Sequence, residues 1–206
     1  MEKQCILSIG REFGSGGHLI GKKLSEHYHL PFYDYDLLKN IASEKNLDLK
    51  LLESYDERPR NRFLTRTVRG FSNSPEENVA RIQFEWLLEK AEKGESFVIV
   101  GRCSETVLKE NPNMISMFIL GDLDKKIERI MERHHVSKEE AKHMIEQMDR
   151  KRKTYHNHYC QGKWGDSRNY DISINSSKLG IDKTVDLLID YIDERKGAVT
   201  DKEVSA

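Results

Sequence analysis

The chain has 206 residues, of which 37% are hydrophobic and 33% charged, and its formal net charge at pH 7 is −1. This composition is typical of one globular domain with a sizeable core, and the near-neutral charge argues against a global basic surface for nucleic acid. We therefore expect no nucleic-acid partner. No apolar run is long enough to span a bilayer, so we also expect no membrane partner.

The first 45 residues predict a compact βαβα unit. An apolar run at residues 4–9 predicts a buried strand, and a glycine-rich turn at 10–17 separates this strand from a helix. Ile20, Leu24 and Tyr28 share one face of that helix. Residues 31–33 predict a very short strand that ends at Asp34, and a further helix is expected over about 36–46.

Between about residues 48 and 73 the apolar residues thin out and arginines accumulate. We expect this segment to form a mostly helical excursion from the core. Its arginines, including Arg62 and Arg66, are candidates to contact a phosphate acceptor, with ordinary solvated or interfacial side chains as the alternative. A proline and two glutamates follow Ser74, a pattern that predicts a capped helix start there.

The second half continues to alternate strands with helices. Continuous apolar runs at 97–100 and 115–120 predict strands that are buried on both faces. Helices are expected over about 123–134, from Ser137 to about 159, and over about 181–195, with a last strand at 170–174. We expect residues 1–196 to form a single domain and residues 197–206 to be disordered. This alternation predicts an α/β fold whose parallel sheet has helices on both faces and binds ligands at the carboxyl ends of its strands.

The glycine-rich turn departs from the strict phosphate-binding pattern GxxxxGK[ST]. Counting from Arg11 puts Gly16 in the second glycine slot, Gly17 where the lysine should stand, and Leu19 near the place of the metal-binding hydroxyl. A strand-to-helix turn can still point backbone N–H groups at a phosphate, although a tight turn with no ligand explains the glycines equally well. If phosphate binds, the missing charge must come from Arg11, His18 or an arginine on a closing segment.

Several segments resemble the cytidylate kinase-like family, which carries a modified P-loop. They are SIGREFGSGG at 8–17, PFYD at 31–34, VIVGRC at 98–103, DRKR at 149–152 and NYDISIN at 169–175. The resemblance covers nearly the whole chain in order. It implies a P-loop NTPase fold of the nucleoside monophosphate kinase type, with a core, an acceptor-binding excursion at about 48–73 and a lid at about 149–168.

The resemblance also implies roles for individual residues, with ATP and Mg²⁺ as cofactors and no metal ligand assigned to the protein. The implied transfer residues are Arg102, Arg150, Arg152 and Asp34. The implied ATP contacts are Arg11, Gly14, Ser15, Gly16, Gly17, His18, Leu19, Arg129 and Arg133. The implied acceptor contacts are Asp36, Arg102, Arg62 and Arg66.

Each of these candidates has a simpler interpretation. Arg102 can be half of a structural ion pair, the cations at 129–152 can be solvated helix faces, and Asp34 and Asp36 can cap the next helix. The histidines at 134, 135, 156 and 158 suggest a metal only loosely, because no carboxylate joins them at ligand spacing. Cys103 is expected to be a small buried residue.

The cysteines and the N-terminus suggest a reducing compartment. Cys5, Cys103 and Cys160 form no CxxC pair, so neither a disulfide framework nor a zinc site is expected. The first predicted strand begins at residue 4 and leaves no room for a signal peptide, so we expect a cytoplasmic protein.

The resulting hypothesis is ATP-dependent phosphoryl transfer to a nucleoside monophosphate, with CMP or dCMP as the expected acceptor. The alternatives are a kinase for another small molecule and a nucleotide-binding regulatory protein that has lost transfer chemistry, for which the missing lysine is the main support. The expected partners are therefore a nucleotide or a small-molecule acceptor. The sequence is compatible with a monomer or a homodimer.

Overall fold

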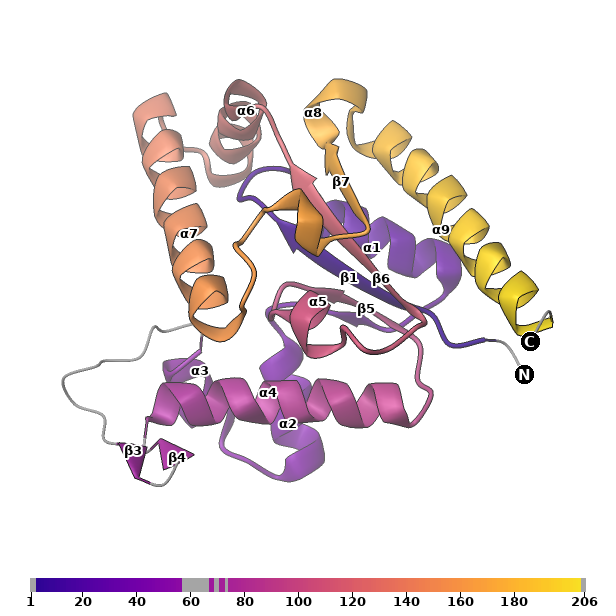
Figure 1. Cartoon of the computed structure of the whole chain (residues 1–206). Coiled ribbons are helices and arrows are strands. Elements are labelled where there is room, and N and C mark those ends of the chain that lie inside the picture. Colours follow the sequence, from indigo (N-terminus) through magenta and orange to yellow (C-terminus); the bar gives the residue numbers. More distant parts are fainter. Residues whose placement is uncertain (1–2, 57–66, 69–70, 73, 205–206) are drawn as a thin grey trace.

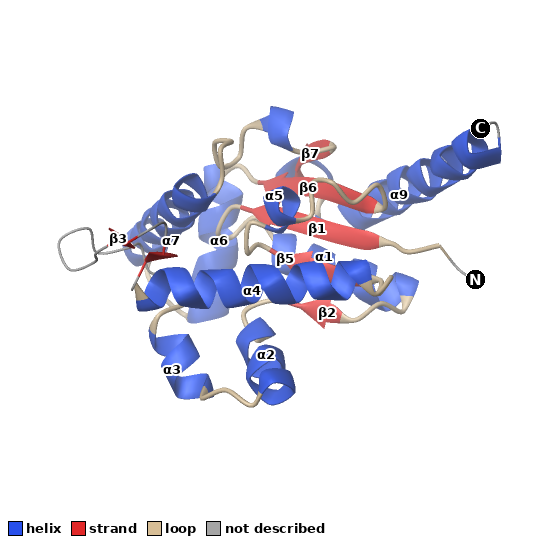
Figure 2. Ribbon diagram, turned by 60° about the horizontal axis from the view of Figure 1, so that its bottom comes forward, coloured by secondary structure: helices blue, strands red, loops and turns tan. Residues whose placement is uncertain are grey.

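The computed structural model of the chain describes residues 3–56, 67–68, 71–72 and 74–204. Five strands form one parallel sheet in the order β2-β5-β1-β6-β7; Figure 1 labels all of them except β2, which is labelled in Figure 2. In that order the strands are Phe32–Tyr33, Phe97–Val100, Ile6–Arg11, Met114–Leu120 and Ile172–Asn175. The predicted α/β fold with a parallel sheet is confirmed.

Helices cover both faces of the sheet because the side chains of the central strands alternate between two cores. In β5, Phe97 and Ile99 face one core, whereas Val98 and Val100 face the other. The first core is closed by α2, α3 and α4, which span Leu37–Lys45, Leu49–Ser54 and Pro75–Glu92. The second is closed by α1 and α9, which span Gly17–Tyr28 and Ile181–Val204. Figure 2 shows α4 lying across the sheet on the face opposite α1.

The strand register brings the candidate residues to one edge of the sheet. Strand β1 lies between β5 and β6, with Ile9 opposite Val100 and Arg11 opposite Ile119. The segments that follow Val100 and Leu120 therefore emerge beside the glycine-rich turn. Ligands of open parallel sheets bind at this edge.

Two helices stand beside this edge and pack against each other (Figure 1). They are α6, Leu123–His134, and α7, Lys138–Tyr159. Helix α7 begins with the predicted capping box, in which Ser137 and Glu140 each accept a hydrogen bond from the other's backbone N–H. Phe13, from the glycine-rich turn, packs against this helix pair. The remaining elements are α5, Ser104–Val107, a 3-10 turn at Ser167–Asn169, and α8, Ser176–Leu179.

Of the excursion expected at about 48–73, the structure describes α3 and a short antiparallel pair, β3 at Thr67–Val68 and β4 at Phe71–Ser72, and the other residues after Asp56 lie outside the described ranges. One expectation about the end of the chain needs correction. The tail predicted to be disordered from 197 is helical to Val204. The first turns of α9 are packed on the sheet, and helix propagation adds one hydrogen bond per residue once a helix has formed. Within the described ranges, no helix has the length and apolar character required to cross a membrane.

Candidate functional site

A cavity of about 630 Å³ lies at the carboxyl edge of the sheet. Of the described residues, two carboxylates line it, those of Glu12 and Asp56. Against them stand six cationic side chains, those of Arg11, Arg102, Arg129, Arg133, Lys151 and Arg152. A volume of this size is within the range of roughly 300–1,000 Å³ that small-molecule sites occupy. The excess of positive charge suits a polyanionic ligand such as a phosphorylated nucleotide.

The glycine-rich turn is shaped to present backbone donors to this cavity. Gly14 and Gly16 adopt φ angles of +80° and +83°, a backbone region that favours glycine. In the described part of the chain, the N–H groups of these two glycines have no hydrogen-bond acceptor. The N–H groups of His18 and Leu19 lie in the first turn of α1, where helices leave their donors unpaired. Together with the positive end of the helix, these donors form an anion cradle.

Neighbouring elements hold the turn in this shape from outside. A Cβ atom at Gly14 would lie only 3.0 Å from the backbone oxygen of Lys126 in α6. Arg129 donates a hydrogen bond to the Gly14 carbonyl at 3.1 Å, and Ser176 donates one to the Ser15 carbonyl at 2.5 Å. The Ser15 hydroxyl is buried and accepts from the Gly17 N–H at 3.3 Å. The turn is therefore preorganised, with the Gly14 and Ser15 carbonyls held by neighbouring side chains.

Arg11 occupies the space beside Gly17. A Cβ atom at Gly17 would lie 2.5 Å from the Cβ of Arg11, and one at Gly101 would overlap the Arg11 guanidinium. The Arg11 side chain therefore runs from the start of α1 to the turn after β5. This packing explains the missing lysine, because no side chain fits at position 17 while Arg11 lies there. Of the three replacement cations that the sequence offers, Arg11 and His18 both line the cavity.

The turn after β5 is strained and carries Arg102. Gly101, Arg102 and Cys103 have successive φ angles of +83°, +62° and +55°. A non-glycine residue in this region costs about 1–3 kcal/mol, and such strain concentrates at functional sites. The Arg102 side chain is only 3% exposed, forms an ion pair with Asp56 and donates to the Gln83 side-chain oxygen at 3.3 Å. Arg102 also lines the cavity. The same side chain therefore forms a structural ion pair and lies where a ligand would bind.

Asp34 lies behind His18 at the end of β2. The His18 Nε2 and Asp34 Oδ2 atoms are 2.7 Å apart, and the other Asp34 oxygen accepts from the backbone N–H of Asp36 at 3.0 Å. The His18 ring stacks on Tyr35, with 6.3 Å between the ring centres. Asp34 therefore orients a cavity residue without lining the cavity itself. Asp36 pairs with Lys39 at 2.6 Å and is not brought to the cavity.

A buried lysine connects the glycine-rich turn to the helix pair. Lys126 lies 3.0 Å from a Glu12 oxygen and 3.3 Å from an Asp149 oxygen. Asp149 accepts a hydrogen bond from the Phe13 N–H at 2.6 Å. Burial raises the pKa of Asp149, although the Phe13 N–H and Lys126 oppose this shift. Arg152, farther along α7, donates to the Arg11 carbonyl at 3.3 Å and lies over the Phe13 ring.

Ten of the residues proposed from the sequence line the cavity. They are Arg11, Gly14, Gly16, Gly17, His18, Leu19, Arg102, Arg129, Arg133 and Arg152. Arg150 is exposed on α7 and does not line it, and Ser15 lies beneath the turn, so neither is in position to touch a ligand in the cavity. Arg62 and Arg66 lie outside the described residues. Sequence reasoning missed Lys151 and Asp56. Lys151 belongs to the same charged run as Arg152, but no local signal points to Asp56.

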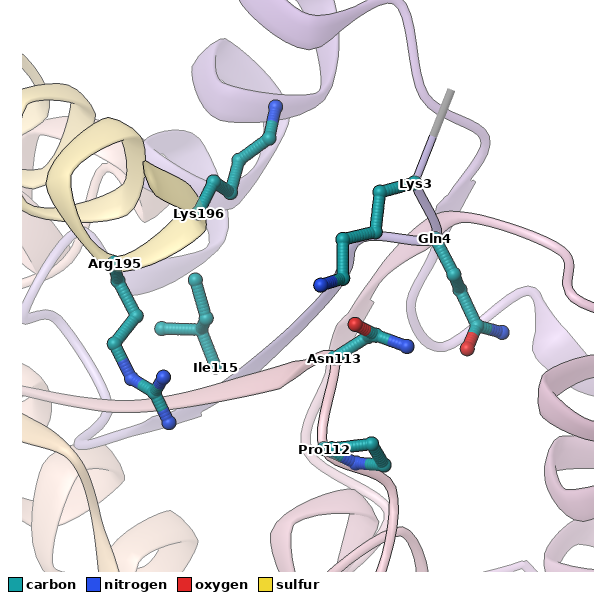
Figure 3. Close-up of a pocket in the computed structure, with 7 residues that line it drawn as sticks. All are labelled: Lys3, Gln4, Pro112, Asn113, Ile115, Arg195 and Lys196. Atoms are coloured by element: carbon teal, nitrogen blue, oxygen red, sulfur yellow. The ribbon is translucent and has the colours of Figure 1, made fainter. Parts of the chain in front are cut away.

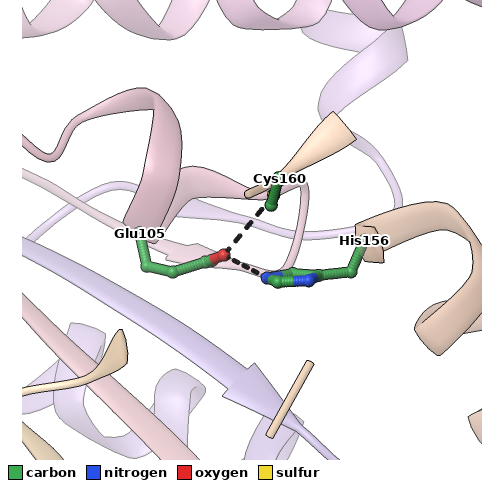
Figure 4. Close-up of side chains that lie close together, drawn as sticks. All are labelled: Glu105, His156 and Cys160. Carbon is green, nitrogen blue, oxygen red and sulfur yellow. Dashed lines mark hydrogen bonds and ion pairs between the residues drawn. The ribbon is translucent and has the colours of Figure 1, made fainter. Parts of the chain in front are cut away.

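A second group of polar side chains is buried next to this site. Glu105, His156 and Cys160 converge, with 2.7 Å between His156 Nε2 and Glu105 Oε1 (Figure 4). Burial disfavours the charged imidazole, but hydrogen bonds with Cys160 and Glu105 outweigh burial and raise the pKa of His156. The expectation that no carboxylate joins this histidine was wrong, because the fold brings Glu105 to it from 51 residues away.

A separate small hollow lies at the opposite, amino-terminal edge of the sheet (Figure 3). Lys3, Arg195 and Lys196 line it, together with Gln4, Pro112, Asn113 and Ile115. Its volume of about 20 Å³ is that of a single water site. It is therefore too small for a nucleotide, and the large cavity is the candidate site.

Comparison with known proteins agrees with this geometry. The sequence profile of the cytidylate kinase-like family matches residues 6–178. The cytidylate kinase of Pyrococcus horikoshii is 27% identical over 205 residues, which cover 97% of this chain and 96% of that protein. A crystal structure of an uncharacterized protein from Eubacterium ventriosum is 46% identical, with a TM-score of 0.74 over 92% of this chain and 99% of that one. Shikimate kinase from Bacteroides thetaiotaomicron is 15% identical and shares the fold, with a TM-score of 0.55 over 92% of this chain and 98% of that one.

Proposed function

The chain belongs to the cytidylate kinase-like family, and we propose that it transfers the γ-phosphoryl group of ATP to a nucleoside monophosphate, with CMP or dCMP as the acceptor. The observation that carries this proposal is the cavity, in which a glycine-rich anion cradle faces six cationic side chains. Donor and acceptor phosphates together bring several negative charges into one small space, and transfer between them requires those charges to be neutralised.

The residues present fit the phosphates of ATP. The N–H groups of Gly14, Gly16, His18 and Leu19 would hold the donor phosphates, and Arg129 and Arg133 flank the same cradle. Mg²⁺ bound with ATP would neutralise charge on the phosphates. The nucleotide would hold this ion chiefly through its own oxygens, because Glu12 and Asp56 are already paired with Lys126 and Arg102. Asp34 is paired with His18 and does not line the cavity.

Catalysis in this proposal consists of positioning and charge neutralisation. Arg11 supplies the positive charge that the P-loop lysine supplies elsewhere, from a position fixed between Gly17 and Gly101. Arg102 binds the acceptor phosphate, which replaces the Asp56 carboxylate as its partner. Arg152 and Lys151 approach from α7, so that movement of this helix toward the turn excludes water from the reacting groups.

The packing of Arg11 against Gly17 also favours a second candidate function, that of a nucleotide-binding regulatory protein without transfer chemistry. The Arg11 carbonyl already accepts from Arg152, and the Arg11 side chain is confined between two glycines. A confined cation can bind a phosphate in the ground state without binding the transferring phosphoryl group more strongly in the transition state. This candidate predicts tight ATP binding with no acceptor-dependent turnover.

A coupled ADP-release assay distinguishes the two candidates. The wild-type chain is incubated with ATP and Mg²⁺ and with one acceptor at a time: CMP, dCMP, UMP, AMP or shikimate. We expect the highest kcat/KM with CMP or dCMP, and calorimetry should detect ATP binding in the absence of acceptor. ATP binding without turnover on any acceptor would support the regulatory function. Turnover only with a non-nucleotide would refute the nucleoside monophosphate acceptor, and the absence of both binding and turnover would refute both candidates.

Arg152→Ala is expected to lower kcat about 10- to 100-fold, since the variant removes one cation from the phosphate site. The matched control is Lys153→Ala, which removes an exposed charge from the adjacent position of α7. We expect Lys153→Ala to change kcat less than about twofold, and Arg150→Ala to resemble this control because Arg150 is also exposed outside the cavity. Equal losses in Arg150→Ala and Arg152→Ala, measured by the same assay, would contradict the assigned geometry.

A further inference from the structure

We propose that Glu105, His156 and Cys160, together with Cys103, form a binding site for Zn²⁺ that is separate from the phosphate-binding cavity. In the described part of the chain, these first three residues place one carboxylate oxygen, one imidazole nitrogen and one sulfur within 4.8 Å of one another (Figure 4). The four side chains belong to residues that are only 4–7% exposed. Nitrogen, sulfur and carboxylate oxygen are the ligands that Zn²⁺ takes in proteins.

The backbone supplies these ligands from two short segments. His156 and Cys160 are one helical turn apart at the C-terminal end of α7, where the Cys160 N–H donates to the His156 carbonyl at 2.8 Å. Residues four apart on a helix lie on the same face, so this pair can chelate a single ion. Cys103 and Glu105 come from the strained turn after β5 and the start of α5. Cys103 packs in the same buried cluster as Cys160 and is hydrogen-bonded to it.

The ligand atoms of Glu105, His156 and Cys160 lie within 4.8 Å of one another, so a shared ion requires the carboxylate and the imidazole to separate and the sulfur to approach. Glu105 Oε1 lies 2.7 Å from His156 Nε2 and 3.9 Å from the Cys160 sulfur. Ligand atoms around a tetrahedral Zn²⁺ with bonds of about 2.0–2.3 Å are separated by roughly 3.3–3.8 Å. The ion would replace the proton shared by the carboxylate and the imidazole, and that proton and the thiol protons would be released to solvent.

The ligand chemistry also separates this site from the Mg²⁺ that accompanies ATP. Mg²⁺ prefers oxygen ligands in octahedral geometry, whereas two sulfurs and an imidazole suit Zn²⁺. A carboxylate–imidazole pair alone would satisfy Glu105 and His156, but it does not account for the two cysteine sulfurs that are buried beside it. A small cavity of about 30 Å³ next to the cluster is lined in part by Cys103, Glu105 and His156. Arg11, Arg102 and Arg152 line both this cavity and the large one.

Occupancy of the site would fix the end of α7 to the turn that carries Arg102. Without metal, the two segments are joined by the His156–Glu105 ion pair and by packing. With metal, four ligand bonds would join them. The Zn²⁺ would therefore act on the geometry of the phosphate site without touching a nucleotide.

The test uses the full chain after treatment with a chelator and a thiol reductant. Co²⁺ is the probe, because Co²⁺ bound to thiolates absorbs in the near ultraviolet and tetrahedral Co²⁺ absorbs in the visible. We expect both bands to saturate at one equivalent of Co²⁺ and to disappear when Zn²⁺ is added. Cys160→Ser should weaken Co²⁺ binding about 100-fold or more. Cys5→Ser, which changes a buried cysteine in a different core, is the matched control and should leave both bands unchanged.

Circular dichroism and thermal unfolding accompany each titration. If Cys160→Ser does not fold, Glu105→Gln takes its place, because glutamine still offers His156 a hydrogen-bond acceptor while it removes the charged ligand. The proposal is overturned if the wild-type chain develops no thiolate band at one equivalent of Co²⁺. It is also overturned if the folded Cys160→Ser or Glu105→Gln chain binds Co²⁺ as the wild type does. None of these readouts depends on kinase activity.

Discussion

Turnover of the Arg102→Ala variant is expected to fall about 1,000-fold, a loss typical of an arginine that neutralises charge during phosphoryl transfer. Arg102 is nearly fully buried, lines the cavity and is directed there by a strained turn at the end of β5. Water cannot replace its guanidinium at such a site, and no other cation of the cavity emerges from this strand. The coupled ADP-release assay with CMP as acceptor measures the effect.

Stability must be measured in parallel, because the substitution also breaks the ion pair with Asp56. Removing one partner of a buried pair typically costs about 3–5 kcal/mol. The double variant Arg102→Ala/Asp56→Ala removes both charges and should recover much of that stability while turnover stays low. Arg102→Lys keeps the charge but loses the planar fork, and we expect an intermediate rate. A folded Arg102→Ala chain that retains turnover within about threefold would remove Arg102 from the mechanism.

Restoring the lysine of the strict P-loop pattern, by Gly17→Lys, is expected to damage the protein. The new Cβ would lie 2.5 Å from the Arg11 Cβ and 3.3 Å from the Ile119 Cβ. Overpacking of this kind costs about 1–3 kcal/mol and would displace Arg11 or the start of α1. Because the phosphate donors belong to that first turn, we expect ATP affinity to fall about 100-fold, as measured by calorimetry, and the thermal midpoint to decrease.

The control for this substitution is Gly197→Lys in α9, where nothing lies within 4 Å of an added Cβ. It introduces the same side chain and charge without a collision, so the thermal midpoint and the ATP affinity should remain unchanged. Gly17→Ala separates size from charge, and it should lose most of the affinity that Gly17→Lys loses. If Gly17→Lys bound ATP as tightly as the wild type, Arg11 would not be filling the place of the lysine.

Local patterns in the sequence were sufficient to predict the sheet and most of its helices. Apolar runs such as Phe97–Val100 and capped starts such as Ser74 and Ser137 are properties of neighbouring residues, so they are visible in the sequence. The position of Arg102 followed from the same reasoning, because a residue directly after a buried parallel strand must emerge at the ligand edge. The end of α9 was predicted less well, since helix propagation beyond a packed face leaves little trace in composition.

The partners of the site residues could not be predicted, because they come from distant parts of the chain. Asp56 reaches Arg102 across 46 positions, and Glu105 reaches His156 across 51. The members of each pair come together only when the whole chain has folded. By contrast, helix geometry could have shown from the sequence that Arg152, and not Arg150, faces the cavity. Arg152 lies seven residues after the buried Ile145 and shares its face of α7, whereas Arg150 is rotated about 140° from it.

The course of the Arg11 side chain has a consequence for how this sequence can change. A side chain at position 17 would collide with the Arg11 Cβ, whereas one at position 101 would require the Arg11 guanidinium to move. Substitutions at positions 11 and 17 are therefore expected to be coupled. A chain that carried both Arg11 in its present course and a lysine at position 17 would meet the collision. A change to the ordinary P-loop pattern would therefore require Arg11 to be replaced before or together with Gly17.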